Sequence, residues 1–275
     1  MDGRGTRAPS VRWWELSWPE IDALDRDRTI LLLPTGAIEQ HGPHLPVDTD
    51  IHDACELSVR AAAASGVRAL VLPPVWWGMS PHHMGYPGTI SLPLETYSAL
   101  IRDICAAVSH HGFRRVLIVN GHGGNVAILG ATALRISEEL GLFVGTVSYW
   151  HLIGQQLREI GTSELGGMGH ACEMETSLQL HLRPELVSMA DARKDLPRPL
   201  TPFSGIDFRD PGPLAIALDF RRDSTEGVMG DPTVATPQKG AAIAEAVLEE
   251  LARVIEAFGN APLSRAHRDT AGHVS

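Results

Sequence analysis

The chain has 275 residues, of which 44% are hydrophobic and 20% are charged, so a folded core of ordinary size is expected. Its formal net charge of −10 at pH 7 argues against nucleic acid or an anionic membrane as the partner. A small-molecule ligand remains compatible with this composition.

The two ends of the chain and its cysteines bear on location. Residues 1–11 are rich in Gly, Arg and Pro and are expected to be disordered, with no apolar segment of signal-peptide length. No run approaches the ~18 apolar residues of a membrane helix. The cysteines form no CxxC pair and are expected to be buried thiols in a reducing compartment: Cys55, Cys105 and Cys172. We therefore expect a cytoplasmic protein with a single domain over residues 12–260 and a loose tail over 261–275.

Strands and helices are expected to alternate along the chain. Apolar runs indicate strands at residues 29–38, 68–73, 115–119 and 141–148. Helical spacing or capping indicates helices at 17–26, 52–64, 94–109, from about 125, at 171–182 and at 240–258. The remaining stretches are expected to be a long loop at 74–89, a Gly-rich connector at 155–169 and an exposed excursion with short strands at 201–239. This order favours an α/β domain with a mainly parallel sheet and helices on both faces.

The first strand leads into a stretch of potential metal ligands, EQHGPHLPVDTD, from Glu39 to Asp50. Its prolines and glycine predict a loop at the carboxyl end of the strand, where sites in such sheets collect. In extended backbone Glu39 and His41 would point to one side, and Asp48 and Asp50 would repeat that relation. Carboxylates and imidazoles suit a divalent metal such as zinc or manganese. The alternative is a polar surface loop.

Two later stretches have the same character. His122 lies in the segment NGHGGN, directly after a predicted strand. Two alternatives to a ligand role for His122 are a glycine turn with an incidental histidine and a phosphate-binding loop. His170, Glu173 and Glu175 lie at the start of a predicted helix, where a carboxylate such as Glu173 also suits the positive helix end. If the three stretches follow strands of one sheet, they converge on one pocket.

Several motifs in this order resemble the creatininase (creatinine amidohydrolase) family of metal-dependent hydrolases. They are PTGAIEQHGPHLPVDTD at 34–50, HHMGYPGTISL at 82–92, NGHGGN at 120–125, SYW at 148–150, GHACEMETS at 169–177 and GVMGDP at 227–232. The resemblance spans about residues 12–258. It implies a three-layer α/β/α sandwich, two divalent metal ions per chain (Zn, Mn or Fe) and a homo-oligomer whose size is left open, although the family often forms hexamers.

The resemblance also implies residue roles. Glu39, Asp50 and His122 would hold one metal, and His41, Asp50 and Glu175 the other, with Asp50 as the bridge. His170 would be the catalytic acid and base. His44 and Asp48 would fix the loop. The substrate pocket is expected to include Trp150, His82, His83, Tyr86, Trp77, Gly123 and Glu173. The two ions would activate a water and polarise a carbonyl, so that a C–N bond is hydrolysed.

The substrate is left open by two departures from creatininases, which have a glutamate where this chain has Gly124 and a tryptophan where it has Gly166. The expected substrate is a cyclic or small non-peptide amide. Other family activities are alternatives: a formamidopyrimidine deformylase, a mycofactocin-precursor peptidase and an inosose-ring hydrolase. A metal-free binding protein on the same fold is the alternative from another class.

Overall fold

The computed structural model describes residues 10–196, 198, 200–264 and 267. A four-stranded parallel sheet forms its centre, in the order β2 (Ala69–Val71), β1 (Ile30–Thr35), β3 (Arg115–Asn120) and β4 (Phe143–Ser148). Chain order therefore reverses between β1 and β3, and ligand sites in open sheets form at this switch point. The predicted disordered N-terminus and loose tail lie mostly outside the described residues.

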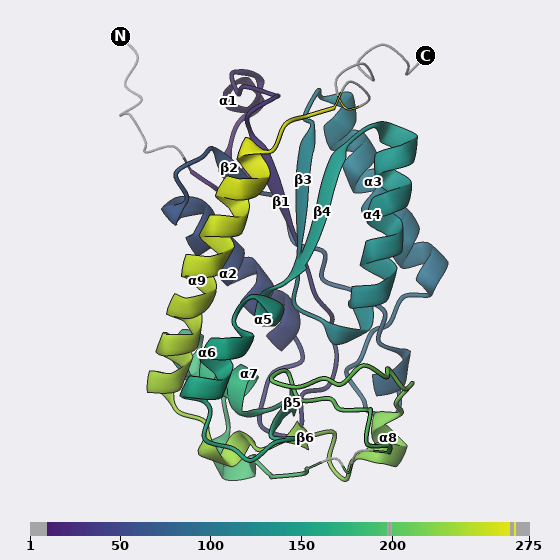
Figure 1. Cartoon of the computed structure of the whole chain (residues 1–275), viewed down its shortest axis with the longest axis vertical. Coiled ribbons are helices and arrows are strands. Elements are labelled where there is room, and N and C mark those ends of the chain that lie inside the picture. Colours follow the sequence, from purple (N-terminus) through teal and green to yellow (C-terminus); the bar gives the residue numbers. More distant parts are fainter. Residues whose placement is uncertain (1–9, 197, 199, 265–266, 268–275) are drawn as a thin grey trace.

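Successive side chains of β1 belong alternately to two separate hydrophobic cores. Ile30 and Leu32 pack against α2 (Thr49–Ala64) and α9 (Pro237–Asn260), whereas Leu31 and Leu33 pack against the opposite layer. The helices of that layer are α3 (Leu94–His110) and α4 (Val126–Leu140). Figure 1 shows the sheet between these two pairs of helices. The three-layer α/β/α fold predicted from the sequence is thus confirmed.

Shorter elements lie at both ends of the sheet: those that precede β1 lie at the amino ends of the strands, and the others lie toward the carboxyl ends. The helices among them are α1 (Trp18–Asp22), α5 (Tyr149–Leu152), α6 (Gly154–Ile160), α7 (Glu173–Leu182) and α8 (Phe220–Asp223). The 3-10 turns are η1 (Trp13–Glu15), η2 (Pro81–His83), η3 (Gly123–Asn125), η4 (Pro184–Leu186), η5 (Met189–Asp191) and η6 (Pro232–Val234). Strands β5 (Met168–His170) and β6 (Met229–Gly230) form an antiparallel pair. No helix within the described ranges is long and apolar enough to cross a membrane.

Two sequence predictions about this region were wrong. Residues 155–169 are not an irregular connector, because most of α6 lies in them and β5 begins at Met168. Leu157 is fully buried against the first core, which explains why this short segment is helical despite its polar neighbours. The second error concerns Asp50, which lies in the first turn of α2 and not in an extended loop. Its side chain therefore does not repeat the orientation of Asp48.

The packing of α7 against α9 gives a stability prediction. Gly240 lies where the two helices meet, and a Cβ there would overlap the backbone carbonyl of Ser177. Gly240→Ala is expected to lower the free energy of unfolding by about 1–3 kcal/mol, because neither backbone can retreat easily. The melting temperature should fall by several degrees, roughly 2–4 °C per kcal/mol.

Gly130→Ala is the matched control for that substitution. Gly130 is an exposed position in the helix α4, and a Cβ there would meet nothing within 4 Å. Alanine favours a helix over glycine by up to ~1 kcal/mol, so this variant should melt at or above the wild-type temperature. Equal melting temperatures for Gly240→Ala and the wild type would contradict the close packing.

Candidate functional site

Asp50 occupies the centre of the candidate site. Its Oδ1 lies 3.0 Å from Nε2 of His41, and its Oδ2 lies 2.9 Å from Nδ1 of His122. Gly121 permits this placement, because a Cβ there would overlap the carbonyl of Asp50 and push the first turn of α2 away from the end of β3. The carboxylate thus joins a histidine that follows β1 to a histidine that follows β3.

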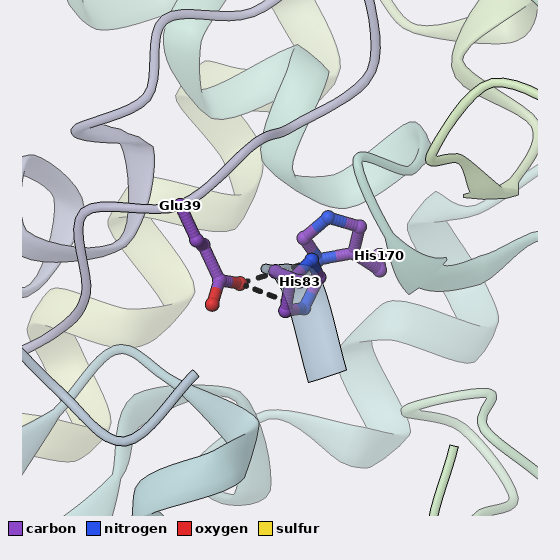
Figure 2. A group of neighbouring side chains, drawn as sticks. All are labelled: Glu39, His83 and His170. Carbon is purple, nitrogen blue, oxygen red and sulfur yellow. Dashed lines mark ion pairs between the residues drawn. The ribbon is translucent and has the colours of Figure 1, made fainter. Parts of the chain in front are cut away.

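Glu39 adds a second buried carboxylate. Its Oε2 lies 3.2 Å from Nδ1 of His122, and its Oε1 faces two more imidazoles. The distances from Oε1 are 3.3 Å to Nε2 of His83 and 3.6 Å to Nδ1 of His170. Figure 2 shows this carboxylate facing both rings. Glu39 therefore connects the metal-type cluster around Asp50 with the predicted catalytic histidine.

Glu175 completes the cluster from the first turn of α7. Its Oε1 lies 4.0 Å from Nε2 of His41, while its Oε2 accepts a hydrogen bond from the backbone N–H of Cys172 at 3.2 Å. That bond is part of the helix cap and fixes the carboxylate at the start of the helix. All five predicted ligands are buried and lie in one place: Glu39, His41, Asp50, His122 and Glu175.

Further contacts orient the ligand-type imidazoles. Nε2 of His122 lies 3.2 Å from the carbonyl oxygen of Met79, and Nδ1 of His41 lies 3.2 Å from the carbonyl oxygen of Glu39. A carbonyl only accepts, so each of these nitrogens donates its proton there. The opposite nitrogen of each ring faces the carboxylates, where it would give its lone pair to a bound ion in place of a proton. Histidines that ligate metals are usually held in this way.

The charges of the cluster call for a cation. Within the described residues, the ion-pair partners of Glu39, Asp50 and Glu175 are all histidines, with no Lys or Arg among them. Glu39 Oε2 and Asp50 Oδ2 are buried without a properly oriented hydrogen bond. Three buried carboxylates in one cluster are unfavourable unless positive charge compensates them.

The pKa shifts describe the same imbalance. Burial alone would lower the pKa of His41, but the carboxylate of Asp50 outweighs it and raises that pKa to about 10. Burial raises the pKa of Glu175 to about 7. Burial also lowers the pKa of His82 to about 4 and that of His170 well below its usual value. The carboxylates thus favour protons on His41 and His122, and a bound cation would take the place of those protons.

Among the residues that the structure describes, histidines and carboxylates form four groups of three whose ligand atoms lie within 4.8 Å of one another. These groups are Glu39–His41–Asp50, Glu39–His82–His122, Glu39–His83–His170 and His41–His170–Glu175. The residues come from β1, α2, η2, β3, β5 and α7 or the loops beside them. Ligand-type side chains from several elements therefore meet at the switch point of the sheet, as a site for more than one metal ion requires.

His170 belongs to two of these groups and lies at the end of β5. Its Nε2 is 2.9 Å from the carbonyl oxygen of Gln40, so this nitrogen carries the ring proton and Nδ1 is left as the base. The ring centroid lies 4.3 Å from that of His41. The following residue, Ala171, has φ +50°, an unusual conformation for a non-glycine residue. A buried, neutral imidazole with one free nitrogen beside a metal-type cluster can accept and return a proton.

The residues predicted for the substrate pocket lie in several environments. His83 is buried beside Glu39, and Trp77 is 45% exposed. The guanidinium of Arg221 lies over the ring of Tyr86, with its Cζ 5.1 Å from the centroid of that ring. Gly123 begins the turn η3 and faces open space.

Two of the predicted pocket residues are held by other contacts. Trp150 packs in the first core, with its ring 5.3 Å from that of Phe208. Glu173 accepts hydrogen bonds from the backbone N–H groups of Thr162 and Ser163 and pairs with Lys239. Their pocket roles stay predictions.

Loop-fixing contacts are present at the two residues expected to provide them. Both carboxylate oxygens of Asp48 accept hydrogen bonds from Arg183 at 2.8 Å, a bidentate pair. His44 Nε2 lies 2.9 Å from Oγ1 of Thr176 on α7. These contacts tie the loop after β1 to the helix that carries Glu175.

Sequence reasoning missed two residues that complete the site. The side chain of Gln40 donates to the carbonyl of Gly227 at 2.9 Å and lies 2.9 Å from Nδ1 of His83. Phe220 of α8 covers the imidazoles: its ring centroid lies 4.0 Å from that of His83 in a stacked contact and 4.6 Å from that of His170 in an edge-to-face contact. Gln40 stands between two predicted ligands, which was a usable signal. Phe220 lies in the excursion and had no local signal.

Comparisons with known proteins agree with this geometry. The creatininase family model, described as creatinine amidohydrolase, matches residues 14–255. The chain is 32% identical to the mycofactocin precursor peptide peptidase of Mycobacterium ulcerans, over 86% of this chain and 85% of that protein. It is 29% identical to the creatinine amidohydrolase of Pseudomonas putida, over 90% and 96% respectively. A solved structure described as creatininase Mn superposes with a TM-score of 0.76 at 29% identity, covering 92% of this chain and 100% of that one.

Proposed function

Since the chain belongs to the creatininase family and is an amidohydrolase, we propose that it cleaves the C–N bond of a small amide at a centre of two divalent metal ions. One observation carries the proposal. The carboxylate of Asp50 lies between His41 and His122, with one oxygen toward each ring. A carboxylate shared in this way is the element that a centre of two ions needs.

The residues fit two ions with a common bridge. Glu39, Asp50 and His122 would hold one ion, and His41, Asp50 and Glu175 would hold the other. Their oxygen and nitrogen donors suit zinc, manganese or iron. The fit rests on the two buried carboxylate oxygens that lack oriented partners and on the carbonyls that hold the rings of His41 and His122.

Bound divalent ions supply Lewis acidity, which favours both the activation of water and the polarisation of a substrate carbonyl. The remaining chemistry belongs to His170. Its Nε2–H stays on the carbonyl of Gln40, so Nδ1 is the atom that takes up a proton and delivers it to the departing amine. Phe220 covers the imidazoles and limits their access to water.

The substrate class is proposed as a cyclic or small non-peptide amide, in line with the creatinine amidohydrolase to which the chain is similar. A precursor peptide is the second candidate, because the chain is 32% identical to the mycofactocin precursor peptide peptidase over 86% of its length. A homo-oligomer, as in the sequence prediction, is part of the proposal.

Metal analysis and a substrate screen test the proposal together. Purified protein should carry about two divalent ions per chain, and removing them with a chelator should abolish hydrolysis until zinc, manganese or iron is restored. The screen should include creatinine, a formamidopyrimidine and short peptide amides. Fewer than about one ion per chain, or hydrolysis that persists without metal, would refute the metal-dependent mechanism.

A further inference from the structure

We propose that His82 is a metal ligand that completes the site formed by Glu39 and His122, in place of the pocket role expected from the sequence. The inference rests on the proposed metal centre and extends it by one residue. His82 lies in the turn η2, on the loop between β2 and α3.

The ligand atoms are already grouped. One ligand atom each from Glu39, His82 and His122 lies within 4.8 Å of the other two. Ligand atoms around one tetrahedral ion at ~2.1 Å are ~3.4 Å apart, so these three atoms need to approach one another by at most about 1.4 Å to bind one ion. The ring planes of His82 and His122 are 18° from parallel with centroids 5.6 Å apart.

Gly124 makes room for the imidazole of His82. A Cβ at that position would lie 2.9 Å from Cε1 of His82 and 2.5 Å from the carbonyl oxygen of Met79. Both distances are too short for any side chain to be accepted without movement. The glycine therefore leaves a space beside His122 that the His82 ring occupies.

The hydrogen-bond pattern leaves His82 free to bind an ion. Across the residues that the structure describes, neither ring nitrogen of His82 makes a hydrogen bond, although the ring is largely buried. The Oε2 atom of Glu39 nearby is also buried without an oriented partner, and the Glu39 side chain is only 1% exposed. A buried acceptor oxygen and a free imidazole nitrogen beside each other are well suited to a shared cation.

The neighbouring His83 shows the contrast. Its Nε2 lies 3.3 Å from Glu39 and its Nδ1 lies 2.9 Å from the side-chain nitrogen of Gln40, so both ring nitrogens have partners. Its ring also stacks on Phe220. His83 thus positions the carboxylate of Glu39, whereas His82 has a lone pair to offer.

The test compares metal affinity in His82→Ala, in His82→Glu and in His111→Ala, an exposed histidine at the end of α3. Each variant is titrated with Zn²⁺ against a competing chelator, and Co²⁺ absorption reports the ligands of the bound ion. His82→Ala is expected to keep one ion at wild-type affinity and to bind the other at least about 100-fold more weakly, because losing a direct ligand should cost no less than the 10–100-fold that losing an outer partner costs. His82→Glu should recover part of the affinity, and His111→Ala should match the wild type.

Two outcomes would overturn the inference, and they separate it from the proposed function. If His82→Ala binds two ions with wild-type affinity and an unchanged Co²⁺ spectrum, His82 is not a ligand while the metal centre stands. If the wild type binds no ions, the metal centre and the role of His82 fail together. Melting curves of the metal-free variants establish that the chains compared are folded.

Discussion

Replacing Asp50 by alanine is expected to remove both metal ions and to abolish hydrolysis. Asp50 has one carboxylate oxygen toward His41 and the other toward His122, so its loss takes an oxygen from each proposed ion. It would also leave Glu39 and Glu175 as buried carboxylates around an incomplete site. Because Lewis-acid assistance supplies several kcal/mol, turnover should fall on the order of 10³-fold or more. Elemental analysis and steady-state kinetics on the same preparation measure both effects.

Asp53→Asn is the matched control for Asp50→Ala. Asp53 is fully buried one turn further along α2, where its Oδ1 accepts a hydrogen bond from Gln179 at 2.7 Å. Burial raises the pKa of this carboxyl, so a neutral amide should be tolerated there. The control should therefore retain its metal and most of its activity. If a folded Asp50→Ala variant still bound two ions per chain, Asp50 would not be the bridging ligand.

The fold was predictable from the sequence because its strongest signals are local. The apolar run at 29–38 contains β1, and every residue of that strand is buried, so no polar position interrupted the pattern. The boundaries were less predictable at the start of α2. The prolines and the glycine before it were interpreted as a loop up to Asp50, but the helix already begins at Thr49, with Asp48 as its cap. Tertiary contact with Gly121 holds that first turn in place.

The site was predictable where ligands stand beside strand ends and unpredictable where they depend on distant segments. Because β1 and β3 pair in the sheet, the residues that follow these two strands lie close together, and they include Glu39, His41 and His122. Phe220 reaches the site from residues 201–239. This segment has no hydrophobic periodicity from which the burial of a particular side chain could be predicted. A lone phenylalanine in such a segment has no local feature that distinguishes a site residue from an exposed one. The ligand role proposed for His82 also depends on a distant residue, Gly124.

Replacing His170 by alanine is expected to lower turnover by about 10²–10⁴-fold while leaving metal content unchanged, because general acid–base catalysis typically contributes that much. The residue lies beside the proposed ligands, but its Nε2 is committed to the carbonyl of Gln40 and its Nδ1 lies 3.6 Å from Glu39. Loss of the ring removes a proton carrier and leaves the shared carboxylate of Asp50 in place. Elemental analysis beside kinetics distinguishes this result from that of Asp50→Ala.

The leaving group provides the sharper readout for His170. If Nδ1 delivers the proton to the departing amine, the loss caused by His170→Ala must shrink as that amine becomes less basic, since a weakly basic leaving group departs with little help. A series of amides of the accepted substrate, from alkylamines to anilines with electron-withdrawing groups, measures this dependence. His170→Asn keeps a polar side chain without a basic nitrogen, so it should show the same trend. An equal loss across the series, or a loss that tracks metal content, would assign His170 to positioning its neighbours and take the proton transfer away from it.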